Sequence, residues 1–412
     1  MSASEKPAPE HFTDSSPAAE ARCRVVVVDR VSDLDPYIGA WTTLAKEALE
    51  PNVFFEPWFL RPALKAFADP SRDPLLARRL CLVAVFGEPA GPPTKVPRNE
   101  LWGIFPLERK PAGGALPVSH FRLFQHDYSY LPTPLLHRTY ARPVLTAFFD
   151  WLESQKRCQP LLAIDDFPVD GPFHQLLVEE VGRRRAQVLV RDRWTRAVLR
   201  PDCDAETYEA RALAGKHRKE LRRQKRRLGE VGKLEFNTLG PDSSAGEAES
   251  WLQAFMSLEA SGWKGREGTA LGSRIPDALF FKEMSRDCHA AGKLAATAVR
   301  LDGRALVMQI LLRCGAGAFA YKIGYDESFA RYSPGVLLEL DLVERVANGK
   351  MLAWIDSAAT RDHPMINRLW TERRAIERWV IGLDPASGLW LAGLPMLQWG
   401  LAMLRKDRET KK

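Results

Sequence analysis

The sequence predicts an α/β fold made of two similar halves. A chain of 412 residues is too long for one ordinary hydrophobic core, and its 45% apolar and 27% charged residues lie in the globular range. Residues 293–356 alternate between strand-like and helix-like patterns. Two short matches also recur about 190 residues apart, Tyr140–Pro143 with Tyr332–Pro334 and Leu161–Asp165 with Met351–Asp356. Together these observations favour a duplicated α/β unit.

The elements of the first half follow from apolar runs bounded by Gly, Pro, Asn and Asp. The Pro/Gly-rich stretch Gly87–Arg98 is an expected exposed loop, and the second half starts near Thr195–Leu199. The expected strands are Val25–Val28, Leu80–Phe86, Leu101–Leu107, Leu161–Ile164 and Ala186–Val190. The expected helices are Leu34–Leu49, Glu56–Phe67, Pro143–Ser154 and Phe173–Arg185.

Two hairpins open the most informative stretch, residues 293–356. Asp302-Gly303 lies between two strand-forming runs, a strong signal for a tight turn. Cys314–Gly317 separates Leu306–Leu312 from Phe319–Ile323 in the same way. These runs predict two antiparallel strand pairs.

A helix start suited to phosphate follows the hairpins. Ser333 is a good N-cap residue, Pro334 fits the first helical position, and Gly335 lets a ligand approach the backbone of the first turn. Free N–H groups at a helix start bind phosphate. The buried strand Met351–Asp356 then ends in a carboxylate. This order predicts acyl transfer from a donor of the coenzyme A type.

These motifs resemble those of the GNAT family of acyl-coenzyme A N-acyltransferases. The similarity is to the branch that includes CelD-type cellulose-biosynthesis proteins and is related to FemAB-type peptidoglycan transferases. It covers about Cys23 to Asp356 and implies two tandem GNAT-like domains with mixed central sheets flanked by helices. Besides the stretch already described, it is carried by Trp41 with Phe54–Trp58, Trp102–Leu107, Lys216–Arg227, Ser261–Arg266 and Tyr332–Gly335.

The resemblance also implies domain limits. We expect a disordered tail at residues 1–21, a GNAT-like domain at 22–192, an acyltransferase domain at 193–380 and an apolar segment with a basic end at 381–412. The first domain is expected to be degenerate as a cofactor site, because it lacks a Gly after its Pro.

By resemblance, the donor is acetyl-coenzyme A or another acyl-coenzyme A, and no metal is expected. The strand Phe319–Ile323 would grip the pantetheine, and Tyr332–Val336 would hold the pyrophosphate. Lys322 is expected on the strand face opposite Tyr321, either reaching a phosphate or facing solvent, whereas Tyr321 favours the core. The cofactor-binding candidates are Tyr321, Lys322, Ile323, Tyr332, Ser333, Pro334, Gly335 and Val336.

Three residues are candidates for the proton transfers, because the acceptor amine must lose a proton and the leaving thiolate must gain one. Asp356, at a strand end expected to face the cleft, is a general base, an acceptor-binding residue or a cap of the next turn through Ser357 or Ala358. Glu259 is a second candidate base, and Tyr325 is a candidate donor to the thiolate.

The Gly-rich segment 261–270 is expected to bind the acceptor. Trp263 can stack on a sugar or base, although Trp263 taken alone favours a core position, and Lys264 and Arg266 can meet a carboxylate or phosphate. The segment His126–Tyr130 has no nucleophile elbow and is expected to line a cleft between the halves.

The charge pattern and the cysteine content indicate which partners and which cellular compartment to expect. Lys216–Arg227 carries eight cations against one Glu, which predicts an exposed basic helix for tRNA or anionic lipid, or a merely solvated face. The uncharged, Trp-containing segment Ser387–Leu404 favours a docked terminal helix over peripheral membrane contact. Six scattered cysteines without a CxxC pair and a polar N-terminus predict a cytoplasmic protein, with the inner membrane face as the alternative.

The expected function is acetyl-coenzyme A-dependent N-acetylation of an acceptor in envelope or exopolysaccharide metabolism. One alternative is a FemAB-like transferase that uses aminoacyl-tRNA. Another is a non-catalytic GNAT-like subunit of a polysaccharide assembly, because residues 357–364 lack the Tyr-Lys pair that many relatives carry after the strand-ending Asp.

Overall fold

The computed structural model describes residues 21–68, 79–88, 100–113, 116, 118–155, 160–349 and 352–393. The expected N-terminal tail, most of the expected loop at 87–98 and the end of the apolar C-terminal segment lie outside these ranges. Among the described residues, no helix is long and apolar enough to cross a membrane.

The first half contains the elements that its apolar runs predict, with shifted ends. The expected helix at 34–49 is divided, because a 3-10 turn precedes the α-helix. Its strands are β1 (Arg22–Val28), β2 (Leu80–Glu88), β3 (Glu100–Lys110), β4 (His120–Leu123), β5 (Leu135–Leu136), β6 (Leu161–Pro168) and β7 (Gln187–Leu199). Its helices are η2 (Val31–Tyr37), α1 (Ile38–Lys46), η3 (Val53–Phe55), α2 (Pro57–Phe67), α4 (Ala141–Glu153) and α5 (Pro172–Arg183).

The second half repeats this order of strands and helices. Its strands are β8 (Leu234–Leu239), β9 (Leu294–Leu301), β10 (Arg304–Cys314), β11 (Gly317–Tyr325), β12 (Trp354–Asp356) and β13 (Glu372–Gly382). Its helices are α6 (Ala205–Ala212), α7 (Gly215–Val231), α8 (Ala245–Ser261), α9 (Trp263–Arg266), α10 (Ile275–Ala290), η4 (Glu327–Tyr332), α11 (Pro334–Ala347) and α12 (Ile366–Leu369).

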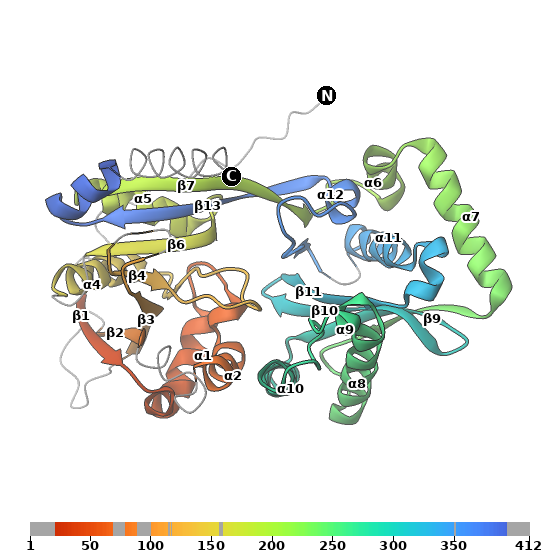
Figure 1. Ribbon diagram of the computed structural model, residues 1–412, viewed down its shortest axis with the longest axis horizontal. Coiled ribbons are helices and arrows are strands. Elements are labelled where there is room, and N and C mark those ends of the chain that lie inside the picture. The colour runs from red at the N-terminus through yellow and green to blue at the C-terminus, as the bar shows by residue number, and fades with distance from the viewer. Residues whose placement is uncertain are drawn as a thin grey trace, which may run out of the picture.

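The repeat is visible in the sheet connections. Four antiparallel strands lead into a helix and a parallel strand in each half: β4 pairs with β6 across α4, and β11 pairs with β12 across α11. Each half then gives its last strand to the other. β13 pairs with β6 of the first half, and β7 pairs with β12 of the second (Figure 1). The tandem α/β fold is therefore confirmed.

The exchange of strands joins the two expected sheets into one. Its order is β1-β2-β3-β4-β6-β13-β7-β12-β11-β10-β9-β8, with β5 beside β3. The strand expected at 186–190 continues through 195–199, where the second half was expected to start, because β7 pairs with β13 from Gln187 to Val198. The expected domain limits at 192 and 380 consequently fall inside β7 and β13.

Both predicted hairpins of the second half are present. Asp302 and Gly303 have positive φ angles of 50° and 81° in the tight turn between β9 and β10, and Gly315 with φ 57° turns β10 into β11. β11 carries an irregularity, because Lys322 pairs with Ile310 and Ala320 with the next residue, Leu311. Tyr321 is thus the extra residue of a bulge.

One hydrophobic core continues from the first half into the second. It contains Phe54 and Phe59 from the start of the chain together with Phe280, Phe319 and Tyr321. The helices α2 and α10 lie side by side at this junction (Figure 1). A buried ion pair crosses it as well, because Lys293 donates to both carboxylate oxygens of Glu56 at 2.6 Å.

Candidate active site

A pocket of about 650 Å³ lies where β11 separates from β12. β12 pairs with β11 only at Gly317, Ala318 and Phe319. Beyond Phe319 the two strands diverge, so the pocket reaches the backbone of β11 near Ile323 and Gly324. Such a splayed strand offers backbone N–H and C=O groups to a ligand, as we expected for this strand.

The start of α11 forms one wall of the pocket, and Ser333, Pro334, Gly335 and Val336 all line it. Ser333 occupies the N-cap position with φ 50° and ψ 51°, but its side chain makes no capping hydrogen bond. The expectation that Ser333 caps this helix is therefore wrong. Because the side chain leaves the first N–H groups without a cap, they are available to a phosphate.

Gly335 leaves open space in front of the first turn of α11. A Cβ at this position would meet only the Met365 side chain, at 3.6 Å from Sδ and 4.0 Å from Cε. Such distances are ordinary van der Waals contacts, so alanine fits here and a large side chain would project into the cavity. The first turn of α11 therefore stays open to the cavity.

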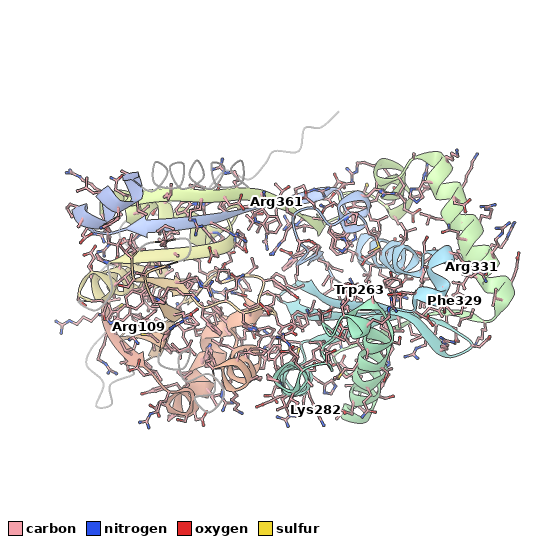
Figure 2. The ribbon with its side chains drawn as sticks, in the orientation of Figure 1. Arg109, Trp263, Lys282, Phe329, Arg331 and Arg361 are labelled. Atoms are coloured by element: carbon pink, nitrogen blue, oxygen red, sulfur yellow. The ribbon has the colours of Figure 1, made fainter. Side chains whose placement is uncertain are left out.

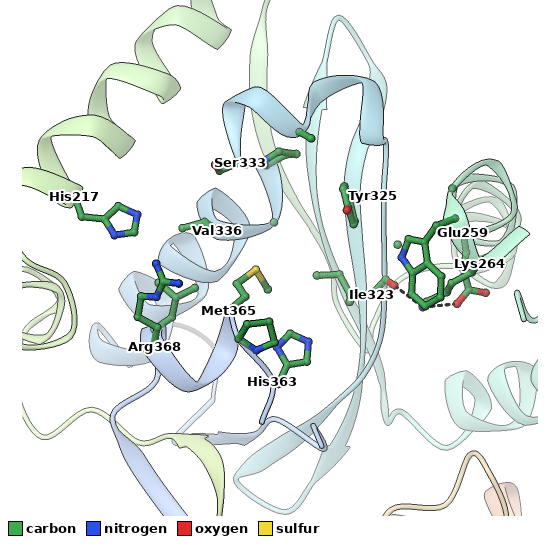
Figure 3. A pocket seen from close by; sticks show the side chains of 18 residues that line it. His217, Glu259, Lys264, Ile323, Tyr325, Ser333, Val336, His363, Met365 and Arg368 are labelled. Carbon is green, nitrogen blue, oxygen red and sulfur yellow. Dashed lines mark hydrogen bonds and ion pairs between the residues drawn. The ribbon is translucent and has the colours of Figure 1, made fainter. Parts of the chain in front are cut away.

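The opposite wall carries an ion pair between buried Glu259 and half-buried Lys264 (Figure 3). Lys264 donates from Nζ to Glu259 Oε1 at 2.9 Å and to the backbone carbonyl of Ile323 at 3.1 Å. The second oxygen, Glu259 Oε2, accepts from the N–H of Leu271 at 2.9 Å, and Glu259 is 4% exposed. α8 and α9 thereby present a fixed carboxylate to the cavity and hold the β11 strand in place. A carboxylate with further lone pairs can still accept a proton.

Two aromatic candidates stand near the pocket mouth. Tyr325 lines the cavity and is 37% exposed. Trp263 lines it too and is 44% exposed, so the core position favoured for Trp263 alone is wrong (Figure 2). Its backbone N–H donates to Glu327 at 2.7 Å, which holds the turn before α9. Arg266 does not line the pocket, because it pairs with the same Glu327 at 2.6 Å.

Asp356 does not line the pocket, and the cleft-facing position expected for it is not observed. Its side chain is fully buried and ion-paired with Arg196 at 2.8 Å and with Arg374 at 3.0 Å. Oδ1 also accepts from the N–H of Ala358 at 2.9 Å, which is the capping role weighed against catalysis. With both oxygens occupied by structural partners, this carboxylate has the environment of an internal ion cluster.

Three cofactor candidates also lie away from the cavity wall. Tyr332 packs on Phe329 and under the Arg331 guanidinium, 4.8 Å from its ring centroid. Tyr321 is buried in the shared core. Lys322 was expected on the opposite strand face, but the bulge brings both side chains onto Tyr130: the Tyr321 and Tyr130 ring centroids are 5.8 Å apart, and Lys322 Nζ is 5.8 Å from the Tyr130 ring.

Sequence patterns did not assign four further residues that line the pocket, His217, His363, Met365 and Arg368. His217 belongs to the basic run that begins α7, and the others lie between β12 and β13 (Figure 3). Burial lowers the pKa of His363, so its imidazole is neutral near pH 7. These residues reach the pocket because α7 and the segment around α12 pack beside it, and no local sequence pattern predicts that packing.

Comparison with known families agrees with this geometry. Residues 215–360 match the family model described as an acetyltransferase (GNAT) domain. Residues 215–360 therefore form a GNAT acetyltransferase domain. That domain runs from the first residue of α7 to just beyond β12, so it contains the Glu259–Lys264 pair, β11 and the start of α11. The chain is accordingly an acyltransferase.

Solved structures resemble the chain only distantly. FemX has 11% identity and a TM-score of 0.47, covering 83% of this chain and 95% of that one. The C-terminal domain of a putative lysylphosphatidylglycerol synthetase from Agrobacterium fabrum has 12% identity, a TM-score of 0.45 and coverages of 71% and 83%. A tandem GNAT protein from the clavulanic acid pathway has 15% identity, a TM-score of 0.39 and coverages of 88% and 99%. No curated protein sequence matches at a significant level.

The corresponding place in the first half is filled by side chains. Tyr140, at the start of α4, stacks on Trp102 with ring centroids 3.8 Å apart, and Phe148 stacks on Phe105 at the same separation. Arg142 in the first turn pairs with Glu179 at 2.5 Å. These contacts support the proposal that the first half no longer holds a cofactor.

Proposed function

We propose that the chain transfers an acyl group, most simply acetyl, from acetyl-coenzyme A to the amine of an acceptor. The observation that carries this proposal is one cavity that joins an uncapped helix start at Ser333–Gly335 to the Glu259–Lys264 ion pair. The donor supplies a thioester whose carbonyl carbon is attacked by nitrogen while the carbon–sulfur bond breaks.

The first turn of α11 would hold the pyrophosphate of the donor. Its free N–H groups and the positive end of the helix dipole both favour an anion. The backbone of β11 beyond Phe319 would hydrogen-bond the pantetheine, because β12 no longer pairs with it there. No cluster of metal-ligating side chains occurs among the described residues.

Glu259 would accept the proton that the attacking amine loses. Its carboxylate lines the cavity beside Ile323, and its orientation is fixed from two sides by Lys264 and Leu271. Tyr325 would donate a proton to the departing thiolate from the pocket mouth. Proton transfer by a positioned side chain typically accounts for 10²- to 10⁴-fold in rate, on the order of the effect expected for Glu259.

The acceptor would enter beside Trp263 and Lys264. By resemblance to CelD-type proteins, it belongs to envelope or exopolysaccharide metabolism. Trp263 is exposed at the mouth, where its ring can stack on a sugar. Arg266 would act indirectly, by holding Glu327 and through it the backbone of Trp263.

A FemAB-like transfer from aminoacyl-tRNA is the second candidate, and α7 favours it. Lys216, Lys219, Arg223, Arg226 and Arg227 are exposed and recur at helical spacing along one side of α7. The helix lies at the outer edge of the second half, and its His217 lines the pocket (Figure 1). The end of a nucleic acid bound along this side of α7 would reach the cavity.

The test is to measure both donors in parallel with the full chain. Acetyl-coenzyme A is titrated by calorimetry, and aminoacyl-tRNA is measured by filter retention at increasing salt. We expect micromolar binding of acetyl-coenzyme A. Tight, steeply salt-dependent tRNA binding without it would replace the proposal by the FemAB-like function. Binding of neither would contradict both donor assignments.

A further inference from the structure

A cluster of polar side chains lies behind the pocket wall, at the junction of the two halves. Lys322 Nζ lies 4.5 Å from the ring centroid of Tyr128, 5.7 Å from that of Tyr321 and 5.8 Å from that of Tyr130. His126 belongs to the same cluster, with its ring centroid 6.2 Å from that of Tyr128. The segment His126–Tyr130 thus lines the junction between the halves, as its sequence led us to expect.

Three hydrogen-bond donors in this cluster have no acceptor among the described residues. The Tyr321 hydroxyl has no hydrogen-bond partner, although the residue is only 3% exposed. Lys322 is half-buried, makes no ion pair or hydrogen bond within the described chain, and has its Nζ beside the rings of Tyr128, Tyr130 and Tyr321. His126 Nδ1 accepts from the N–H of Tyr128 at 3.3 Å, which leaves the proton of the neutral ring on the unpartnered, buried Nε2.

The histidine is neutral at ordinary pH. Burial, reinforced by the charge of Lys322, lowers the pKa of His126 to about 3. Burial also lowers the pKa of Lys322, while the charges of Glu259, Asp127 and Asp277 raise it. Two of these carboxylates already have cations of their own, because Glu259 pairs with Lys264 at 2.9 Å and Asp277 with Arg274 at 2.7 Å.

Unmatched buried donors cost folding free energy, and several around one cation form a site for an anion. Lys322 precedes Ile323, whose carbonyl Lys264 holds at the pocket wall. We propose that Lys322, Tyr321 and His126 bind an anionic group, a carboxylate or a phosphate, of the acceptor. The inference rests on the proposed function, because it places the acceptor on this side of β11.

The position of Lys322 limits the acceptor. Lys322 directly precedes Ile323 and Gly324, which line the pocket, while its Nζ lies over the ring of Tyr128 from the first half. The acceptor is accordingly an amine that carries an anionic group in the same molecule. An amino acid and an amino-sugar phosphate both have this arrangement.

The experiment measures protection of Lys322 in the full-length protein. The chain is reductively methylated in increasing acetate or inorganic phosphate at constant ionic strength, and labelling is quantified by mass spectrometry. Lys282, an exposed lysine on α10, is the internal control (Figure 2). We expect one or both anions to slow labelling of Lys322 at least threefold with saturation and to leave Lys282 unchanged. The more effective anion identifies the acidic group.

Tyr321→Phe provides the matched variant, because it removes only the unpartnered hydroxyl. The concentration of anion for half-maximal protection should rise about tenfold, as expected for a hydrogen bond to a charged group, without loss of thermal stability. If neither anion protects Lys322, or if Tyr321→Phe leaves the half-maximal concentration unchanged, the inference is wrong.

These outcomes are separable from failure of the proposed function. The same preparation is titrated with acetyl-coenzyme A by calorimetry. A protein that binds acetyl-coenzyme A without anion protection of Lys322 overturns only the acceptor inference. Protection without binding of acetyl-coenzyme A overturns only the donor assignment.

Discussion

Arg196 and Asp356 form a buried ion pair that joins strands from the two halves of the chain. Arg196 Nε lies 2.8 Å from Asp356 Oδ1, and their side chains are 2% and 0% exposed. Arg196 lies on β7, Asp356 on β12, and Arg374 on β13 completes the cluster at 3.0 Å. The cluster therefore lies where β7 connects β12 to β13.

Replacing Asp356 by asparagine should destabilise the fold. Removing one partner of a buried ion pair leaves an uncompensated charge, which costs about 3 to 5 kcal/mol. Urea denaturation followed by circular dichroism measures the loss. Asp341→Asn on α11 is the control, because its helical pair with Arg345 is only partly buried and should contribute less than about 1 kcal/mol. Wild-type stability with abolished turnover in Asp356→Asn would instead make Asp356 a catalytic residue.

Glu259→Gln should reduce turnover without weakening donor binding. The amide keeps an oxygen for the N–H of Leu271 but cannot accept a proton from the amine. We expect kcat to fall by about 10²- to 10⁴-fold while acetyl-coenzyme A binds as before. Steady-state kinetics and calorimetry on one preparation measure both. Glu283→Gln, on α10 and outside the pocket lining, is the control. An unchanged kcat in Glu259→Gln would show that Glu259 is not the general base.

Glu339 should make stability depend on pH. Burial raises the pKa of Glu339 to about 8, although Gln309 donates to its carboxylate at 3.0 Å. Because the folded state binds this proton more tightly than the unfolded state, the stabilisation is complete below about pH 4.5 and is lost as pH rises toward 8. The predicted loss is on the order of 3 to 5 kcal/mol.

Glu339→Gln should abolish that component, since the amide does not titrate. Urea denaturation at pH 5 and pH 8 measures it. Glu344→Gln, exposed on the same helix, should keep the wild-type pH dependence. An equal loss of stability between the two pH values in wild type and Glu339→Gln would show that another group is responsible.

Local patterns predicted the elements and much of the pocket. The turn residues Asp302-Gly303 and the order of Pro334 and Gly335 at a helix start depend on backbone preferences that act within a few residues. Glu259 is a sequence candidate because it precedes the Gly-rich segment 261–270, and it lines the cavity from the end of α8. These parts of the site follow from short-range chemistry.

The rest of the site depends on pairing between strands that are far apart in the sequence. Asp356 lies at the end of its strand as expected, but β7 and β13 supply two arginines that cover it, and no local pattern reveals that exchange. The bulge at Tyr321 likewise reversed the expected direction of Lys322. His363 reaches the pocket only because the segment after β12 folds back beside α11.

Calorimetric titration of acetyl-coenzyme A into wild type, Gly335→Ala and Gly335→Trp tests the central claim most directly. The claim predicts micromolar binding to wild type, binding within about threefold in Gly335→Ala because its Cβ meets only Met365, and at least a tenfold loss in Gly335→Trp. Circular dichroism establishes that each variant is folded. Equal binding by folded Gly335→Trp and wild type, or no binding by wild type, would contradict the assignment of this pocket to the acyl donor.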